Sequence, residues 1–274
     1  MLIDFHAHVF SDKIAGRAIE VLQKQMKEAG LAKNLEKIDY AVCYDGTENG
    51  LREFGKANGV DLFVTLPIAT KEKQTDTINR FARSITGGNI LSFGSIYPGQ
   101  HNWESILDEL SADGIKGIKL HPEFQNFEID SRKSVELLKK AEQLGLIVVI
   151  HAGEDEGYVT PVKCTPKKLY NVLQEVRGAN IVAAHMGGSM MWDDVEKYLV
   201  GTPLYFDTAF VSRVLDKTQC LRIIRNHGVD KILFGSDIPW ESPTETVEYL
   251  NSIGLTTEEL DSIYYKNALR LLEK

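Results

Sequence analysis

The chain has 274 residues, 43% hydrophobic and 26% charged, which is enough apolar sequence for a large globular core. Its formal net charge of −8 argues against non-specific binding to nucleic acid or to an anionic membrane. No apolar run approaches the roughly 20 residues that span a bilayer, and no signal peptide is visible because charged residues begin at Asp4. Cys43, Cys164 and Cys220 are widely spaced without a CxxC motif, so we expect free thiols and a cytoplasmic protein.

Short runs rich in β-branched residues recur along the chain, with amphipathic helical patterns between them. The predicted strands cover residues 2–9, 60–68, 90–97, 115–121, 146–151, 180–185, 204–208 and 231–237. Residues 131–144 have apolar positions near helical spacing, and Gly145 then ends that helix. Thr165 as N-cap and Pro166 in the first turn begin the next helix.

Eight strands that alternate with helices predict a parallel sheet with helical crossovers. Eight such units favour a closed (β/α)8 TIM barrel over an open doubly wound sheet, because no glycine-rich phosphate loop follows the first strand. Residues 12–59 are too many for one crossover. We therefore expect a distorted barrel with a small insertion after the first strand, made of one or two helices and an extra strand near residues 37–44. No linker divides the chain, so we expect a single domain, residues 1–274.

Histidines gather at the carboxyl ends of the predicted strands, where barrel active sites are built. Five of the seven histidines lie there, and an aspartate follows the last strand: His6, His8, His121, His151, His185 and Asp237. Two imidazoles at positions i and i+2 of one strand can reach the same metal ion, and imidazole suits zinc, iron or nickel. Histidine and carboxylate ligands with a position left for water are typical of a catalytic zinc site. The pattern predicts a metal-dependent active site.

Other polar residues near these strand ends are candidates for proton transfer or substrate binding. Asp237 could be a metal ligand, a general base or both. Lys119 has the same strand parity as His121, so both are expected to point into the barrel mouth and contact substrate. Because a buried, unpaired lysine is costly, Lys119 could be carbamylated, bind an anionic substrate or pair with a carboxylate. Arg213 could hold a substrate carboxylate, and Trp240 could line the pocket.

Five segments resemble the amidohydrolase superfamily, and they keep the order of its motifs over nearly the whole chain. They are Asp4-Phe5-His6-Ala7-His8, Gly117-Ile118-Lys119-Leu120-His121-Pro122, Ile150-His151-Ala152-Gly153, Ala184-His185-Met186-Gly187-Gly188 and Gly235-Ser236-Asp237-Ile238-Pro239-Trp240. The branch that they resemble most is the amidohydrolase-related one, which includes aminocarboxymuconate-semialdehyde decarboxylase.

This resemblance implies a barrel with a divalent metal, zinc by expectation, at its mouth. It implies that His6, His8, His151 and Asp237 are metal ligands, and that His185 polarises the substrate or transfers a proton. In binuclear members His185 would instead bind a second metal, bridged by a carboxylated lysine, so one or two ions are left open.

The leading hypothesis is a metal-dependent hydrolase that activates water against an amide, ester or lactone of a small, carboxylated molecule. The alternative on the same metal is a non-oxidative decarboxylase or hydratase. A metal-dependent deoxyribonuclease is disfavoured by the acidic charge and by a lysine-bearing segment where that group carries glutamate. A non-enzymatic metal-binding or interaction barrel is disfavoured by the intact set of strand-end residues. The expected partner is a small-molecule substrate rather than nucleic acid or a membrane, and a homodimer is left open.

Overall fold

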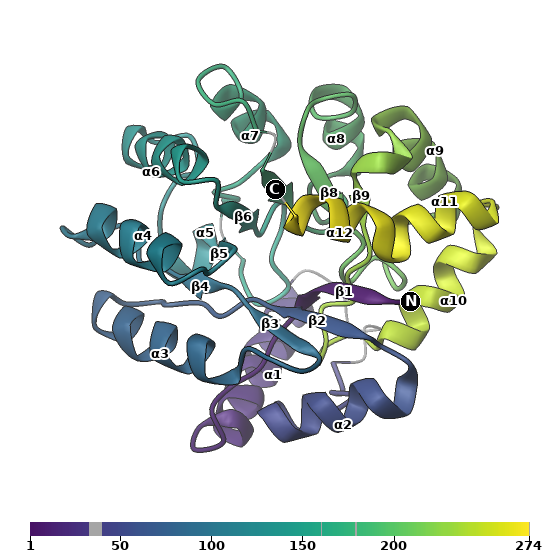
Figure 1. Cartoon of the computed structure of the whole chain (residues 1–274). Helices are drawn as coiled ribbons and strands as arrows, with labels where there is room; N and C mark the ends of the chain where they lie inside the picture. The colour runs from purple at the N-terminus through teal and green to yellow at the C-terminus, as the bar shows by residue number, and fades with distance from the viewer. Residues whose placement is uncertain (33–39, 160, 179, 274) are drawn as a thin grey trace.

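The computed structural model describes residues 1–32, 40–159, 161–178 and 180–273 (Figure 1). Its strands are β1 (Ile3–Ala7), β2 (Leu62–Thr65), β3 (Ile90–Ser92), β4 (Gly94–Ser95), β5 (Gly117–Leu120), β6 (Ile147–Ile150), β7 (Ile181–Ala183), β8 (Tyr205–Asp207) and β9 (Ile232–Leu233). Its α-helices are α1 (Ala15–Ala32), α2 (Glu48–Asn58), α3 (Thr75–Ile85), α4 (Trp103–Ala112), α5 (Pro122–Gln125), α6 (Arg132–Gln143), α7 (Pro166–Val172), α8 (Trp192–Tyr198), α9 (Lys217–His227), α10 (Pro243–Ser252), α11 (Thr257–Asp261) and α12 (Asn267–Leu272).

The strands are parallel and close into a barrel. They pair in the orders β1-β2-β3 and β4-β5-β6-β7-β8-β9, and β3 and β4 are separated only by Phe93. The backbone N–H groups of Phe5 and His8 donate to the carbonyls of Phe234 and Ile238, both at 2.8 Å, and join β1 to the chain after β9. The predicted (β/α)8 barrel is therefore confirmed, and the open sheet is excluded because no free edge remains between β1 and β9.

Each predicted strand contains a strand of the structure, and the predicted helix boundaries also hold. The Thr165 hydroxyl accepts from the Lys168 N–H at the start of α7, with Pro166 in the first turn. Helices α1 and α2 occupy the stretch after the first strand, as expected for the insertion. The expected extra strand is not seen at residues 40–44, and its remaining part lies outside the described residues.

Alternate residues of the strands fill the barrel, while their neighbours pack outward against the helices. The inner cluster includes Phe5, Phe93, Val149, Val182 and Leu233, all buried. Helix α12 adds Ala268 and Leu271 to this cluster, so it closes the end of the barrel opposite the carboxyl ends of the strands. A filled interior leaves the mouth as the place where polar side chains can meet a ligand.

His227, at the end of α9, belongs to the packing outside the barrel and not to the mouth. Its ring stacks on Phe206 with centroids 3.8 Å apart. Nδ1 accepts from the Gly201 N–H at 3.2 Å, and Nε2 donates to the Leu204 carbonyl at 2.9 Å. Burial lowers the pKa of His227 to about 4, although the hydrogen bond to the Leu204 carbonyl opposes this effect.

The low pKa of His227 predicts a dependence of stability on pH. Between the unfolded pKa of 6.5 and the folded pKa of about 4, the unfolded chain binds a proton that the folded chain excludes. Stability should therefore be complete above that window and fall as pH decreases through it. From about pH 7.5 to about pH 5.5 the metal-free protein should lose about 1 kcal/mol more than His227→Gln, whose amide can replace both hydrogen bonds without titrating. Urea unfolding measures this, and equal losses in the two proteins would contradict it.

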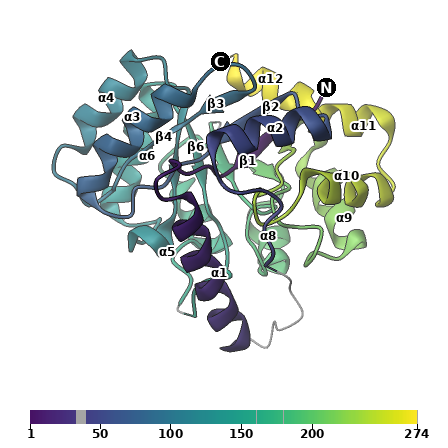
Figure 2. The same cartoon turned by 90° about the horizontal axis from the view of Figure 1, so that it is seen from below.

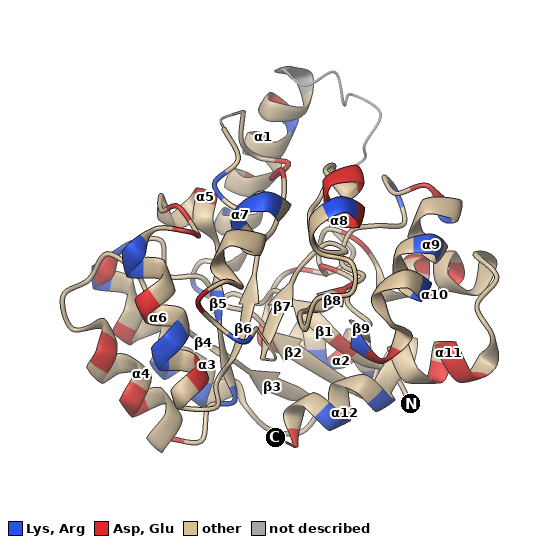
Figure 3. Cartoon of the chain, turned by 90° about the horizontal axis from the view of Figure 1, so that it is seen from above, with Lys and Arg blue, Asp and Glu red and all other residues tan. Residues whose placement is uncertain are grey.

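The structure also bears on three features noted in the sequence: apolar runs, surface charge and the cysteines. The described residues include no helix long and apolar enough to cross a membrane. Basic and acidic residues both occur on the outer helices α3 and α6, whereas the charged residues of α4 are all acidic (Figure 3). Cys43, Cys164 and Cys220 are free thiols, as predicted.

Candidate active site

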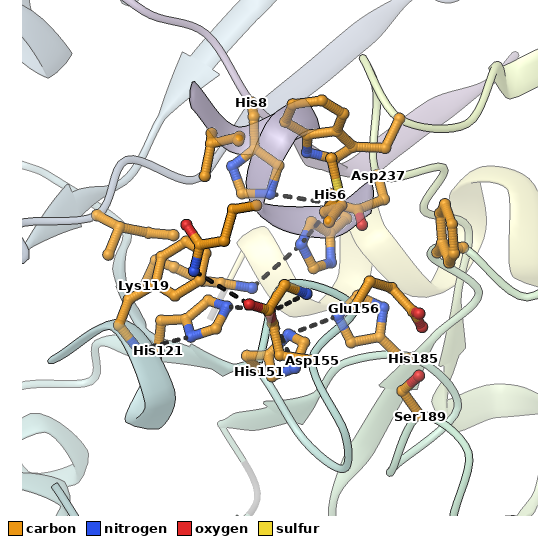
Figure 4. Close-up of a pocket in the computed structure, with 18 of the residues that line it drawn as sticks. His6, His8, Lys119, His121, His151, Asp155, Glu156, His185, Ser189 and Asp237 are labelled. Atoms are coloured by element: carbon orange, nitrogen blue, oxygen red, sulfur yellow. Dashed lines mark hydrogen bonds and ion pairs between the residues drawn. The ribbon is translucent and has the colours of Figure 1, made fainter. Parts of the chain in front are cut away.

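A cavity of about 100 Å³ lies at the carboxyl ends of the strands (Figure 4). The five strand-end histidines, Lys119 and Asp237 all line it. Helix α1, which projects from this end of the barrel (Figure 2), adds Leu22, Gln25 and Met26 to the wall. The structure thus brings together residues that are up to about 230 positions apart in the sequence.

His6, His8 and Asp237 converge on one point of the cavity. Asp237 Oδ1 lies 3.0 Å from His8 Nε2 and 3.4 Å from His6 Nε2. The pairing of β1 with β2 shifts register between Asp4 and Ala7, next to His6. Such an irregularity can change the direction of a side chain at a strand end. The three ligand atoms lie close enough together to contact one metal ion.

Hydrogen bonds on the far side of each ring set its tautomer. His6 Nδ1 lies 2.8 Å from Asp207 Oδ2, and His8 Nδ1 lies 3.2 Å from the Leu66 carbonyl oxygen. Because both partners only accept, each Nδ1 carries a hydrogen, so Nε2 is the atom of each ring that can offer a lone pair to a metal. Both Nε2 atoms therefore face Asp237 Oδ1, and Lys119 Nζ lies within hydrogen-bonding distance of His6 Nε2, at 3.1 Å. Two imidazole nitrogens and one carboxylate oxygen are a donor set that a divalent cation fits.

Asp237 and His185 have unusual backbone conformations at the points where they enter the cavity. Their φ angles are +72° and +57°, in the left-handed region that few residues other than glycine adopt. Hydrogen bonds hold both: the Asp237 N–H donates to the His6 carbonyl at 2.9 Å, and the His185 N–H donates to Asp207 Oδ1 at 2.8 Å. Asp207 thus orients His6 and anchors His185.

The charges of the site are set by burial and by neighbours. Burial lowers the pKa of His6 well below its ordinary value, with Lys119 adding to the effect, so the ring is neutral near pH 7 and available to a metal. Burial alone would raise the pKa of Asp237, but attraction to His6 and His8 holds it below its ordinary value. Asp237 is therefore a carboxylate at neutral pH.

Lys119 lies at the closed end of the cavity, fully buried. Its Nζ donates to His6 Nε2 at 3.1 Å, so it reaches the same lone pair that a metal would use. Burial lowers the pKa of Lys119 to about 8, although Asp207 and Asp237 oppose this effect. This lysine is consequently close to losing its proton near neutral pH, and it is the only lysine or arginine among the described residues that line the cavity.

His151 faces His185 rather than the point shared by His6, His8 and Asp237. His185 Nδ1 donates to the Ala209 carbonyl at 3.0 Å, and its Nε2 lies 2.9 Å from His151 Nδ1. The group that places His151 within reach of a metal is instead His121, His151 and Asp155. The sequence predicted His151 as a fourth ligand of the first group, and the structure places it at the border between the two groups.

The structure separates the predicted substrate-binding residues into two sets. Lys119, His121 and Trp240 line the cavity. Arg213 is not among the described lining residues: it forms a salt bridge with Glu245 at 2.9 Å on the surface. Arg213 Nη2 donates to both carboxylate oxygens of Glu245, which directs this side chain to a glutamate of the same chain and not to the cavity.

Sequence reasoning missed the acidic segment Glu154, Asp155 and Glu156, which lines the cavity after β6. Three successive acids, which begin three residues after the strand-end His151, were the signal that could have found it. It also missed Asp4, buried beneath the site, which accepts from the Ser236 N–H at 3.0 Å and so joins β1 to the segment that carries Asp237. Nothing in the sequence indicated that α1 lines the cavity, because the apolar residues of this helix have the pattern of ordinary core positions.

Comparison with known proteins identifies the family. The amidohydrolase family model matches residues 3–274. No curated protein sequence matches the chain. Among solved structures, a probable 2-pyrone-4,6-dicarboxylic acid hydrolase from Acinetobacter baumannii with citric acid bound is 18% identical with a TM-score of 0.66, over 100% of this chain and 99% of that one. The apo IDCase of Metarhizium anisopliae is 15% identical with a TM-score of 0.73, over 100% and 97% of the two chains.

A third similar structure, 5-carboxyvanillate decarboxylase from Sphingomonas paucimobilis, is 13% identical with a TM-score of 0.65, over 99% of this chain and 98% of that one. At such identities these three structures show the shared fold alone. The family model covers nearly the whole length, including all five segments that carry the resemblance in the sequence. The chain therefore belongs to the amidohydrolase family of metal-dependent enzymes.

Proposed function

We propose that this protein is a metal-dependent hydrolase acting on an amide, ester or lactone of a small carboxylated molecule. The observation that supports it most is the convergence of two histidine lone pairs and one carboxylate at the barrel mouth. His6, His8 and Asp237 would hold the ion, and zinc is the first ion to test because it takes imidazole and carboxylate ligands. A divalent ion supplies a Lewis acid and activates water near neutral pH.

The chain's own residues have separate roles in this proposal. Asp207 keeps the hydrogen of His6 on Nδ1, which leaves Nε2 free. Asp237, ionised and partly accessible, can accept a proton from water held near it. His185 has its Nδ1 hydrogen committed to Ala209, so its Nε2 is the atom able to accept a proton and, once protonated, to donate to a substrate oxygen. The two groups enter the cavity after different strands, His185 after β7 and Asp237 after β9.

A small carboxylated substrate is proposed because Lys119 offers one cationic group at the closed end of the cavity. The similar structures include a probable hydrolase and a decarboxylase whose names specify carboxylated rings. Non-oxidative decarboxylation on the same centre is the second candidate, favoured by the decarboxylases among those structures. Turnover of a panel of carboxylated lactones and aromatic acids, by metal-free and zinc-loaded protein, tests both. Hydrolysis supports the first proposal, release of carbon dioxide supports the second, and no zinc-dependent turnover would contradict both.

Neutralising Lys119 tests the charge of the substrate. Lys119→Met should raise KM for a carboxylated substrate by about 10-fold or more, with a smaller change for a neutral analogue, because a charged hydrogen bond is lost. Metal content should stay unchanged. Lys116→Met is the matched control, since Lys116 is exposed just before β5. Equal KM changes for neutral and anionic substrates would remove the charge argument, and loss of metal would indicate a carbamate bridge instead.

A further inference from the structure

We infer that the substrate is a monocarboxylate whose opposite end is a short apolar group, and that Met26 on α1 limits the length of that group. The inference deepens the proposed function and rests on it. It follows from two unlike regions of the cavity. The closed end holds the buried amine of Lys119, whereas the wall that α1 supplies is apolar at Leu22 and Met26.

The positive charge that the described walls supply lies at one end of the cavity. Lys119 is the one lysine or arginine among the lining residues that the structure describes. Its Nζ lies 3.1 Å from His6 Nε2, the atom proposed to bind the metal, so the lysine and an ion would form one cationic region. A substrate carboxylate suits this region, and a second carboxylate at the other end of the same molecule would lie farther out.

A second carboxylate would have unfavourable neighbours there. The acidic segment at residues 154–156 lines the cavity after β6. The guanidinium of Arg213 lies 5.9 Å from the ring centroid of Phe210, but it forms a salt bridge with Glu245 and does not line the described cavity. Since like charges repel and an unpaired charge is costly to bury, the cavity disfavours a dicarboxylate.

An apolar group, in contrast, has a surface to pack against. Leu22, Met26, Phe210 and Trp240 line the cavity and belong to a small apolar cluster that is separate from the barrel core. Met26 and Trp240 are 9% and 8% exposed. Apolar surface that packs against them is removed from water, which favours binding. Methionine is unbranched and flexible, so its side chain can adapt to the shape of a small apolar group.

A hydrogen bond holds this wall in place. Gln25 Nε2 donates to the Gly157 carbonyl at 3.1 Å and so joins α1 to the loop after β6. The two segments pack closely, because a Cβ added at Gly157 would lie 3.4 Å from Gln25 Cγ. Met26 follows Gln25 directly. Its side chain therefore limits how far an apolar group can extend from the closed end toward α1.

Binding of unreactive acids to the zinc-loaded protein tests the inference without a turnover assay. Butanoate, hexanoate and hexanedioate are titrated by calorimetry. Each added methylene that is buried should tighten binding about 4-fold, so hexanoate should bind at least about 10-fold more tightly than butanoate. Hexanedioate should bind at least about 10-fold more weakly than hexanoate, because its second carboxylate faces the acidic segment.

Two substitutions test the position of the apolar group. Met26→Lys adds a cation to the wall and should reverse the order of hexanoate and hexanedioate. Val21→Lys is the matched control, because it adds the same charge to the exposed face of the same helix, where Val21 is 55% exposed. It should leave the order unchanged. Met26→Ala should bind octanoate more tightly relative to hexanoate than wild type does, and circular dichroism verifies that each variant is folded.

The possible results separate this inference from the proposed function. Hexanedioate that binds wild type as tightly as hexanoate, or hexanoate that binds no more tightly than butanoate, would overturn the inference. Either result leaves the proposed function standing, since that function requires only one carboxylate. Equal effects of Met26→Lys and Val21→Lys would overturn the role of Met26. The expected order of affinities in a protein without zinc-dependent turnover would support this ligand class and contradict the proposed function.

Discussion

Replacing His6 and His8 together with alanine is expected to remove one metal ion per chain and to reduce turnover to the level of the metal-free protein. Both imidazoles offer Nε2 to the same point, 3.0 and 3.4 Å from Asp237 Oδ1, and no other described side chain duplicates their position. With both removed, the carboxylate of Asp237 is the one remaining ligand, which is too few to hold a catalytic ion. Elemental analysis after dialysis measures the metal, and a substrate assay measures turnover.

The fold should survive this double substitution. His6 and His8 lie at the mouth, whereas the barrel is held by the apolar cluster around Phe5 and Val149 below them. The backbone hydrogen bonds of β1 to Phe234 and Ile238 do not depend on the side chains. Circular dichroism of the metal-free proteins compares the folds directly. His101→Ala, which changes an exposed histidine far from the cavity, is the control. Full metal content in a folded double variant would contradict the proposed ligands.

His185→Asn is expected to keep its zinc and to lose activity by about 100-fold or more, the usual scale for a group that transfers a proton. Asparagine suits this position because it tolerates the left-handed conformation better than most residues, and His185 has a φ of +57°. Its amide can still donate to the Ala209 carbonyl in place of Nδ1. The variant therefore removes the reactive Nε2 while keeping the local backbone and its anchor.

Metal content and steady-state kinetics are measured on the same preparation of His185→Asn. A fall in kcat with unchanged metal identifies His185 as a catalytic residue. Loss of metal together with activity would show that His185 is a ligand. His101→Asn is the matched control, because it makes the same exchange on the surface and should change neither quantity.

Much of this protein could be predicted from its sequence, because the information is local. Each strand is a short apolar run, and each helix begins and ends at residues whose side chains cap it, as at Thr165. Eight such units allow few arrangements, and parallel strands place their carboxyl ends on one face. That reasoning was sufficient to predict that His6, His8, His121, His185 and Asp237 lie together at the barrel mouth. Their motifs indicated the amidohydrolase family.

Only the tertiary structure decided which neighbours each of those side chains contacts at the mouth. Whether His151 faces His6 or Asp155, and which ring nitrogen carries its hydrogen, depends on His185 and Ala209, which come 34 and more residues later in the chain. Arg213 is held by Glu245, 32 residues away, a pairing that no local pattern indicates. The order of residues along a strand determines which of them reach the mouth. Hydrogen bonds between different strands and loops determine the direction of each lone pair and charge, and these exist only once the barrel has closed.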